Sequence, residues 1–317
     1  MGSTVVRVEG REVRLSNLEK VFWPGGITKG QLVEYYSDIA PVVIPHLRNR
    51  PLVMKRYPDG IGGESFYQKE CPDYAPDWIE TYPVSHSEKN INYIVCNDAA
   101  TLVWLANQAC IEIHAWLSVL DNVECPDIAV MDLDPSEGST FDDVIDIALL
   151  CRRALEEYGL KPFAKTSGAS GLHIFVPIES GYPFRTVTLA MQYIAGLITG
   201  VYPARATVER AVAKRAGKIY LDYLQNARGR TMAFQYSLRP LPGAPVSTPL
   251  LWEELEERRI NPGSFNINTI FKRIDKYGDL LGDLRGHRRS LAGLLEAAGG
   301  TNRAGVTNTG VYTDIHP

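Results

Sequence analysis

The sequence predicts an α+β fold, because segments with a strand period and segments with a helical period mix without the regular β-α-β rhythm of a parallel sheet. No G-x-G-x-x-G motif opens a helix, which disfavours a dinucleotide-binding fold. The chain has 317 residues, 45% hydrophobic and 22% charged, as in globular proteins with a full core. We expect one domain over residues 1–300 and a loose tail over residues 301–317, which lack periodicity.

The N-terminal third of the chain predicts several strands and two helices. Thr28 is a suitable N-cap for a helix whose apolar side chains keep a helical period until Pro45, where we expect the helix to end. Asp98 to about Trp116 predicts a second, mostly apolar helix. Strands are expected in VVRVEG, EVRLS, PLVMKRY (51–57) and NYIVCN (92–97), with a turn in WPGG (23–26).

The rest of the chain predicts further strands separated by helices. Ser139 and Asp142 form a capping-box-like start to a helix that runs to Gly159. A strand is expected over residues 128–134, two strands joined by a Gly/Ser loop over 162–178, and further strands over 218–224 and 232–236. Further helices are expected over residues 185–201, 249–259, 266–276 and 288–298.

Charge is segregated along the chain, although the net charge is only −4 and the pI about 5.9. Asp121 to Glu157 contains eleven Asp and Glu residues against two Arg, whereas Tyr202 to Arg239 contains eight Lys and Arg against two acidic residues. An acidic zone facing a basic zone suits an enzyme that holds cations beside phosphates. Two solvated surfaces of opposite sign would produce the same pattern.

Targeting signals and a disulfide framework are not indicated. No apolar run approaches the roughly 18 residues that span a bilayer, and the N-terminus lacks a signal-peptide pattern, so we expect a cytoplasmic protein. The five cysteines are odd in number and widely spaced, which favours buried free thiols. A metal cluster of Cys71, His86 and Cys96 is a weaker alternative.

Two carboxylates stand out in the predicted strand IAVMDLDPS. Alternation places Asp132 and Asp134 on one face, about 7 Å apart, with Leu133 pointing into the core. Two such carboxylates repel each other unless a cation lies between them, and oxygen ligands favour Mg²⁺ or Mn²⁺. Asp222 is a lone acid in the apolar strand KIYLDYLQN. It either completes this metal site or pairs with a basic residue, Lys218 or Arg239.

The segment TSGASGLHIFVPI (166–178) predicts an anion-binding turn at the start of a strand. Gly168 and Gly171 allow backbone N–H groups to converge on an anion, Ser167 adds a hydroxyl donor, and His173 can donate from its imidazole. Together they form a candidate triphosphate cradle. The alternatives are an ordinary turn and a structural histidine.

The order of these motifs resembles a known family. MDLDPS, KTSGASGLHIFVPI, IYLDYLQN and FQYSLRP are similar to the three motifs of the archaeo-eukaryotic primase superfamily, most closely to the polymerase domain of bacterial and archaeal ligase D. NLEKVFWP, TKGQLVEYY, MKRYPDG and SFYQKE extend the resemblance over residues 10–300. It implies a primase-polymerase fold, in which an RRM-like catalytic sheet is fused to an N-terminal α/β module with flanking helices.

The resemblance also implies an activity. Members of the family are template-dependent nucleotidyltransferases of non-homologous end joining, which fill gaps or extend 3′ ends and prefer ribonucleotides. They use two Mn²⁺ or Mg²⁺ ions and bind a downstream 5′-phosphate. The expected partners are DNA with 5′-phosphorylated ends or gaps, NTPs or dNTPs, and Ku-like and ATP-dependent ligase proteins. The expected setting is a prokaryotic cytoplasm, with action at the nucleoid.

By position, the resemblance assigns roles to single residues. Asp132 and Asp134 are ligands of both metals, and Asp222 is a ligand of the catalytic metal. The resemblance assigns the incoming nucleotide to Ser167, His173, Arg239, His114 and Lys165, beside Gly168 and Gly171 of the loop described above. A structural role for His114, at the end of ACIEIHAW, is an equal alternative. A basic residue is common in the family three positions after the third aspartate, where this chain has Gln225. The lost contact could be supplied by Arg228, Arg230 or Lys218.

The resemblance assigns DNA contacts as well. Lys20 and Lys29 correspond to the lysines that bind the 5′-phosphate, and Lys29 also lies at a predicted helix N-terminus, which favours anions. Phe66 and Tyr67 correspond to the pair that stacks on a template base, and we expect one of them to face DNA and the other the core. Backbone contacts are expected from basic side chains, namely Lys55, Arg56, Arg205, Arg210, Lys214 and Arg215.

Three other functions use the same motifs. A primase would start chains without a primer, but Lys20, Lys29 and the Phe66-Tyr67 pair favour extension of a broken end. A non-catalytic module for end synapsis would not need all three aspartates. A phosphodiesterase remains an alternative, since metal ligands alone do not distinguish synthesis from hydrolysis.

Overall fold

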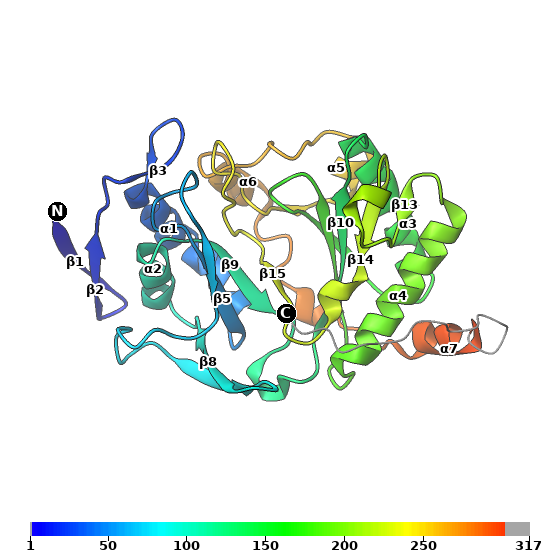
Figure 1. Cartoon of the computed structure of the whole chain (residues 1–317), viewed down its shortest axis with the longest axis horizontal. Coiled ribbons are helices and arrows are strands. Elements are labelled where there is room, and N and C mark those ends of the chain that lie inside the picture. Colours follow the sequence, from blue (N-terminus) through cyan, green and yellow to red (C-terminus); the bar gives the residue numbers. More distant parts are fainter. Residues whose placement is uncertain (1, 302–317) are drawn as a thin grey trace.

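The computed structural model describes residues 2–301, and side chains as far as residue 299. Two six-stranded β-sheets form the two halves of the molecule, with helices packed around them (Figure 1). The predicted α+β class is confirmed. The extent of the domain, residues 1–300, stays a prediction, and the proposed tail lies almost entirely outside the described residues.

The first sheet carries the two aspartates and the Gly/Ser loop. Its strand order is β13 (Ala206–Thr207), β14 (Ile219–Asp222), β10 (Ile128–Pro135), β12 (Leu172–Pro177), β11 (Phe163–Thr166) and β16 (Pro249–Leu250). All pairs are antiparallel except β13 with β14. Two long helices, α3 (Phe141–Glu156) and α4 (Phe184–Val201), contact β10 and bury their apolar sides against this sheet. On the opposite face, Ile128, Val130 and Phe175 pack into the core that is shared with the second half of the molecule, and the polar side chains of the candidate site lie beside them.

The second sheet is built mainly from the N-terminal part of the chain. Its order is β15 (Thr231–Ala233), β9 (Cys110–Trp116), β5 (Pro51–Arg56), β8 (Asn90–Val95) and β7 (Thr81–Ser85), and β6 (Phe66–Gln68) also pairs with β5. The helices α1 (Lys29–Leu47) and α2 (Ala99–Asn107) pack against each other, and α2 also packs against β9. After β14 in the first sheet, the chain comes back to the second sheet to form β15. The chain therefore passes between the two halves of the molecule more than once.

Smaller elements complete the fold. Two hairpins open the chain, β1 (Ser3–Val8) with β2 (Arg11–Ser16) and β3 (Val21–Trp23) with β4 (Ile27–Thr28). The C-terminal part adds α5 (Trp252–Glu256), α6 (Ile270–Tyr277) and α7 (Ala292–Thr301). Single 3₁₀ turns lie at η1 (Leu120–Asn122), η2 (Val212–Lys214), η3 (Tyr223–Asn226) and η4 (Leu284–His287). Within residues 2–301, no helix has the length and apolar character needed to cross a membrane.

The predicted helix from Asp98 to Trp116 is wrong in its second half. Asp98 caps α2 as expected, but α2 ends at Asn107, and Ala109 turns the chain with a φ of 62°. The next segment, β9, is buried on both faces in the middle of the sheet. A strand buried on both faces shows no polar alternation, so its sequence looks like that of a buried helix.

The other deviations concern boundaries. Helix α1 has the predicted Thr28 cap with a full capping box, but it continues through Pro45 to Leu47, since a proline near the last turn removes only one hydrogen bond. The cap of α3 is Thr140, paired with Asp143, one residue later than predicted. The segment predicted as a helix from residue 249 begins with β16 and is helical only in α5.

The cysteines of residues 2–301 match the prediction of buried free thiols in part. All five thiols are free, with Cys96, Cys110 and Cys151 buried and the other two half-buried. The alternative cluster of Cys71, His86 and Cys96 does not form in this part of the chain, where no group of three or more His, Cys, Asp or Glu side chains is arranged to hold a metal ion.

Candidate active site

A row of four polar side chains crosses the first sheet. Asp222 on β14 lies opposite Asp132 on β10, and Asp132 lies opposite His173 on β12. His173 in turn lies opposite Lys165 on β11. Residues paired across antiparallel strands point to the same face. The third aspartate, far away in sequence, is therefore a direct neighbour of Asp132.

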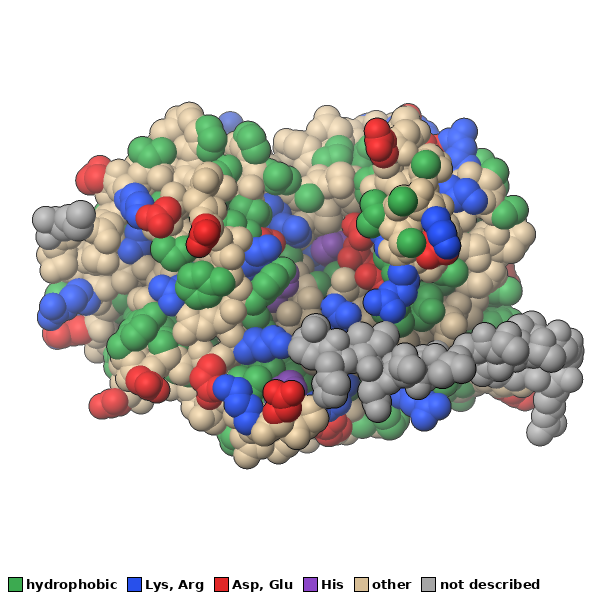
Figure 2. All heavy atoms as spheres, viewed as in Figure 1, with side chains coloured by type: hydrophobic (Ala, Val, Ile, Leu, Met, Phe, Trp, Pro, Cys, Tyr) green, Lys and Arg blue, Asp and Glu red, His purple; other side chains and the backbone are tan. Residues whose placement is uncertain are grey.

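The second aspartate of the D-x-D motif extends this acidic patch. Asp134 follows Asp132 on the same face of β10 and is half-buried, while Leu133 between them is fully buried in the core. The predicted alternation is confirmed. Figure 2 shows acidic, histidine and basic side chains gathered in a hollow between the two halves of the molecule.

Negative charge is crowded at these aspartates. Burial raises the pKa of Asp132 well above its ordinary value, and the charges of Asp134 and Asp222 raise it further. Burial and then Asp222 raise the pKa of Asp134. The Oδ1 atom of Asp132 lies 3.4 Å from His173 Nε2 but makes no hydrogen bond with any described residue. The site thus favours the arrival of positive charge, which matches the carboxylate donors that hard divalent cations prefer.

Asp222 is held by its own neighbours. Its carboxylate accepts hydrogen bonds from the Leu224 N–H at 3.0 Å and from the Tyr220 hydroxyl and the Gln225 amide at 3.3 Å each. The alternative pairing of Asp222 with Lys218 or Arg239 is not formed among the described residues. All three bonds come from within two or three residues of Asp222. In the described part of the chain the three aspartates are neighbours, but their carboxylates are not arranged as a group of three around one metal position.

The Gly/Ser loop between β11 and β12 folds around Ser167. The Ser167 hydroxyl accepts hydrogen bonds from the N–H groups of Ala169 and Gly171, both at 3.1 Å. A side chain at Gly171 would place its Cβ 2.2 Å from the Leu133 carbonyl oxygen, so only glycine lets the loop approach β10. Gly168 has a φ of 74°. The N–H groups of Ala169 and Gly171 are therefore used inside the loop, whereas the Ser167 hydroxyl, which accepts from both, still has its proton to donate.

His173 and Lys165 differ in what they can reach. Burial, with the charges of Lys165 and Arg239, holds the pKa of His173 well below its ordinary value, so the imidazole is neutral at pH 7. Its Nδ1 has no hydrogen-bond partner in the described chain. Lys165 is fully buried, and its ammonium donates to the Ala233 carbonyl and the Ser247 hydroxyl. Lys165 thus supports the loops beneath the site.

A buried carboxylate on the second sheet organises the other side of the hollow. Glu112 on β9 is 2% exposed, and it accepts a hydrogen bond from the Tyr57 hydroxyl at 2.6 Å. Its carboxylate lies 3.0 Å from Arg239 Nε, 3.4 Å from His114 Nε2 and 3.9 Å from Lys55 Nζ. Burial alone would raise the pKa of Glu112, but His114, Arg239 and Tyr57 lower it to about 2. Glu112 is therefore ionised and gathers three basic side chains.

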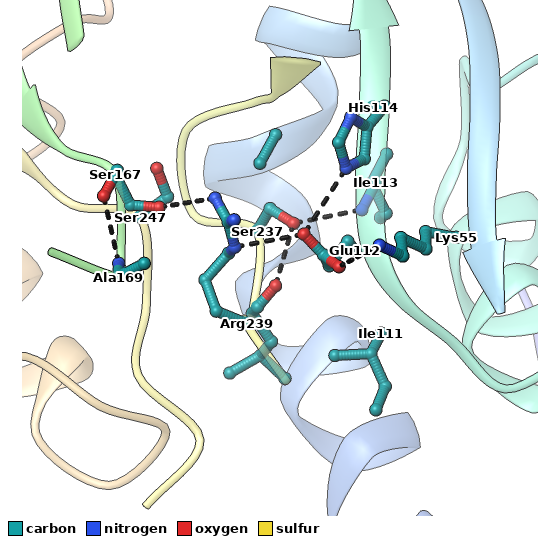
Figure 3. A network of polar contacts seen from close by, with 12 residues as sticks. Lys55, Ile111, Glu112, Ile113, His114, Ser167, Ala169, Ser237, Arg239 and Ser247 are labelled. Carbon is teal, nitrogen blue, oxygen red and sulfur yellow. Dashed lines mark hydrogen bonds and ion pairs between the residues drawn. The ribbon is translucent and has the colours of Figure 1, made fainter. Parts of the chain in front are cut away.

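Arg239 joins the two sheets at this point. Its Nε pairs with the Glu112 carboxylate, and its terminal nitrogen Nη1 donates to the Ser167 carbonyl at 2.7 Å. Figure 3 shows Arg239 between the Ser167 loop and Glu112, with His114 and Lys55 reaching Glu112 from the second sheet. The orientation of the Gly/Ser loop is thus coupled to residues on β9 and β5.

Arginines border the acidic end of the row. A pocket of about 280 Å³ is lined by Asp134 and Asp222 together with Arg210, Arg215 and Arg230. The Arg215 guanidinium lies over the Tyr220 ring, 3.5 Å from its centroid. The pocket thus offers three guanidinium groups beside two carboxylates.

Other predicted basic residues lie outside this pocket. Arg228 pairs with Glu124, and Arg205 pairs with Asp143. The family often has a basic residue where this chain has Gln225, and Arg228 and Arg230 were two of the candidates to replace it. Arg230 is the better placed of these two, because it lines the pocket beside the aspartates, whereas Arg228 is paired with Glu124. Lys214 ends the exposed turn η2.

Comparison with known proteins now identifies the family. A family model for the primase-polymerase domain of LigD matches residues 28–281. The chain belongs to this family. It is similar to the multifunctional non-homologous end joining protein LigD of Mycolicibacterium smegmatis, with 33% identity over 86% of this chain and 36% of that protein. It is also 34% identical to the bifunctional LigD of Bacillus subtilis, over 84% of this chain and 43% of that protein.

A solved structure supports the same assignment. The polymerase domain from Mycobacterium tuberculosis ligase D in complex with DNA matches with a TM-score of 0.81 and 29% identity, covering 87% of this chain and 99% of that domain. The chain spans less than half the length of the two LigD proteins above. The likeness therefore concerns their primase-polymerase domain.

Lys20 and Lys29, the two lysines that the LigD resemblance assigns to the 5′-phosphate, both lie near the start of α1. Lys29 is only 5% exposed and donates to the Ser16 carbonyl at 2.7 Å. Burial, with the charges of Lys20 and Arg56, lowers the pKa of Lys29 to about 8. Lys20 pairs with Asp59 at 2.5 Å. Lys20 and Arg56 thus lie close enough to Lys29 for their charges to lower its pKa, so three cationic side chains lie near the start of α1. The first N–H groups of α1 are already bonded, those of Lys29 and Gly30 to the Lys20 and Leu18 carbonyls and that of Gln31 to the Thr28 hydroxyl, so the attraction for an anion comes from the side chains.

The aromatic pair of this LigD-type domain differs from the prediction. We expected one ring to face the core, but Phe66 and Tyr67 are 46% and 55% exposed. Strand β6 is only three residues long and pairs with β5. The Tyr67 ring meets the His114 ring edge-on, with centroids 5.4 Å apart, yet more than half of Tyr67 stays exposed. Lys55 lies over the Tyr67 ring and Arg56 over the Phe66 ring. Both rings are available for stacking, each with a cation behind it.

Sequence reasoning missed Glu112, Tyr57 and Ser247 among the residues of the site. Only Glu112 had a usable signal, because it is a lone acid in the apolar run ACIEIHAW, two positions before His114. In a helix these positions do not face each other, whereas on a strand they share a face. The wrong helix prediction therefore hid the glutamate.

Proposed function

We propose that this chain is a template-directed nucleotidyltransferase that fills gaps or extends 3′ ends at double-strand breaks, as part of non-homologous end joining. The observation that carries the proposal is the row of Asp222, Asp132 and His173, set beside Ser167 and Arg239 in a member of the LigD primase-polymerase family. Similar proteins are named for non-homologous end joining, and the similar solved domain is a polymerase domain in complex with DNA.

Asp132, Asp134 and Asp222 are the residues that would hold the catalytic cations. The unpartnered oxygen of Asp132 and the raised pKa of both Asp132 and Asp134 fit this role, since a cation would replace repulsion by attraction. When bound, Mg²⁺ or Mn²⁺ ions activate an attacking hydroxyl and stabilise the leaving pyrophosphate. The proposal includes two metal ions, and it includes that these ions are Mg²⁺ or Mn²⁺.

The donors around the aspartates would position the incoming nucleotide. Arg239 is fixed on both sides by Glu112 and Ser167, and the neutral imidazole of His173 can donate one hydrogen bond without adding charge. Arginine forks suit phosphate oxygens, and the guanidinium groups of the neighbouring pocket add positive charge. His114 contacts Glu112, which in turn holds Arg239, so we assign His114 an indirect role in positioning the nucleotide. Lys165 is placed beneath it, and we assign it a supporting role.

DNA would lie along the second sheet. The exposed Phe66 and Tyr67 rings offer sequence-tolerant stacking for a template base, and Lys55 and Arg56 lie behind them. Lys20 and Lys29 would bind a downstream 5′-phosphate. We infer a preference for ribonucleotides and cooperation with Ku-like and ATP-dependent ligase proteins from the family alone.

Gap filling tests this function directly. The protein is incubated with a gapped duplex that carries a downstream 5′-phosphate, with Mn²⁺ or Mg²⁺ and either NTPs or dNTPs. We expect extension of the primer, faster with NTPs and weaker without the 5′-phosphate. Asp222→Ala should abolish extension, whereas the matched control Asp38→Ala, an exposed carboxylate on α1, should not change it.

Each alternative function has its own outcome in that assay. Phosphate-dependent DNA binding without extension by the unaltered protein would support an end-synapsis module. Shortening of the strand would support a nuclease. Products formed on single-stranded template without a primer would support a primase.

Substituting Lys29 tests the 5′-phosphate site. A charge-assisted hydrogen bond is worth about 1.5–3 kcal/mol, so Lys29→Gln is expected to reduce the preference for a 5′-phosphate over a 5′-hydroxyl by roughly 10-fold to 100-fold. Because the pKa of Lys29 is lowered to about 8, the preference of the unaltered protein should also weaken as the pH rises above that value. Fluorescence anisotropy on paired gapped duplexes between pH 6.5 and 9 measures both effects.

The control is Lys272→Gln, which removes an exposed lysine from α6. If both Lys29→Gln and Lys272→Gln keep the full preference for a 5′-phosphate over a 5′-hydroxyl, Lys29 does not bind the 5′-phosphate.

A further inference from the structure

A second pocket lies at the junction of the two sheets, away from the aspartates. Its volume is about 240 Å³. It is bordered by the start of β10 at Ile128 and the end of β12 at Pro177, which are partners across the sheet. Ile128 precedes Asp132 by four residues along the strand, roughly 13 Å at the usual strand rise. The pocket is therefore separate from the candidate active site.

Gln235 lines this pocket and carries an unpaired side-chain amide. Its side chain is 1% exposed, and neither the amide nitrogen nor the amide oxygen has a hydrogen-bond partner among residues 2–301. A buried amide without partners costs free energy, so such a group is normally satisfied. The glutamine amide presents a donor beside an acceptor, which matches the edge of a nucleobase. Apolar side chains beside it, Ile128, Phe234 and Leu284, provide the walls that a flat ring needs.

The same pocket has an excess of positive charge. The buried Asp127 is its one aspartate, and it is shared by Arg50 at 2.7 Å and Arg288 at 2.5 Å. Arg48 and Arg285 also line the pocket, are exposed, and form no ion pair with any carboxylate in the described part of the chain. One carboxylate thus faces four guanidinium groups. An anionic ligand would balance them.

We propose that this pocket binds a nucleoside monophosphate, with the base edge on Gln235 and the phosphate on Arg48 and Arg285. Inorganic phosphate would leave the glutamine and the apolar walls unused, and a neutral nucleoside would leave the two arginines unused. The volume equals that of about eight water molecules at ~30 Å³ each, enough for a base and its sugar with the phosphate at the exposed arginines. The proposal does not depend on the polymerase function.

Calorimetric titration of the full chain in EDTA tests this site, because the chelator removes the divalent ions that nucleotide binding at the aspartates would use. The ligands are AMP, GMP, CMP and UMP, with inorganic phosphate and adenosine as separate arms. We expect 1:1 binding of at least one monophosphate, weakened about 10-fold or more by Gln235→Leu and by Arg285→Ala. Arg153→Ala, which removes an exposed arginine from α3, and Ser167→Ala in the active site should leave binding unchanged.

Several results would overturn the proposal. The first is that no monophosphate binds at millimolar concentrations. The second is that Ser167→Ala abolishes binding and Gln235→Leu does not. The third is that inorganic phosphate alone or adenosine alone binds as tightly as the monophosphate.

Thermal unfolding gives a second, independent readout. Since an apolar side chain removes the unpaired amide, Gln235→Leu should raise the Tm of the ligand-free protein by about 2–4 °C. At the same concentration, the monophosphate should raise the Tm of the unaltered protein more than that of the variant. A lower Tm for Gln235→Leu without ligand would show that Gln235 serves the fold, and would count against a ligand site.

Discussion

Asp132→Asn is expected to abolish nucleotide addition and, at the same time, to stabilise the metal-free protein. The substitution removes one of the carboxylates proposed to hold the cations, which contribute several kcal/mol of charge stabilisation in the transition state. At about 1.4 kcal/mol for each factor of ten, the rate should fall by at least about 10³-fold. Stability should move the other way, because the amide no longer repels Asp134 and Asp222.

The pH dependence follows from the raised pKa of Asp132. The folded protein holds the Asp132 proton more tightly than the unfolded chain does, where the ordinary aspartate pKa is 3.8. The unfolding free energy of the unaltered protein therefore falls as the pH rises above that value. The advantage of Asp132→Asn should be absent near pH 4 and reach about 0.5–2 kcal/mol once Asp132 in the unaltered protein is ionised.

Urea unfolding in EDTA at several pH values measures this difference, and single-nucleotide extension measures the activity. Asp38→Asn is the control, since Asp38 is exposed on α1 and lies outside the acidic row. A variant that is both inactive and less stable than the unaltered protein at neutral pH would show that Asp132 serves the fold.

The acidic row was only partly accessible to sequence reasoning. Alternation along one strand placed Asp132 and Asp134 on the same face, because that inference needs only the local period. The position of Asp222 opposite Asp132 depends on the register between β10 and β14. No local pattern encodes this register, since the two strands are separated by α3, β11, β12 and α4.

Burial was the property that the sequence described least well. Lys165 follows an ordinary strand pattern, yet it is fully buried with its ammonium bonded to Ala233 and Ser247. Phe66 and Tyr67 were expected to divide between DNA and the core, yet both are exposed on the short strand β6. In each case the outcome depends on which layers of the tertiary structure cover a strand.

Glu112→Gln is expected to impair both folding stability and nucleotide binding, although Glu112 lies on the second sheet. The amide keeps the shape of the side chain but removes the charge that Arg239, His114 and Lys55 share. Removing one partner of a buried ion pair costs about 3–5 kcal/mol. We expect a loss near the lower end, about 3 kcal/mol, because Arg239 keeps its hydrogen bond to Ser167.

The stability profile should identify the charge as the cause. The pKa of Glu112 is about 2 in the folded protein against an ordinary value of 4.5, so its stabilising effect is complete above pH 4.5. This effect is lost as the pH falls from 4.5 towards 2. The difference in unfolding free energy between the unaltered protein and Glu112→Gln should therefore shrink over that interval.

The kinetic effect of Glu112→Gln separates a positioning role from a purely structural one. Because Glu112 orients Arg239 beside the Ser167 loop, we expect the KM for the nucleotide to rise about 10-fold or more, with a smaller change in kcat. Glu112→Asp keeps the charge and should recover part of the affinity, whereas Glu34→Gln, on the exposed face of α1, should behave like the unaltered protein. If Glu112→Gln lowers stability but leaves the KM unchanged at a temperature where it is folded, Arg239 does not need Glu112 to bind the nucleotide.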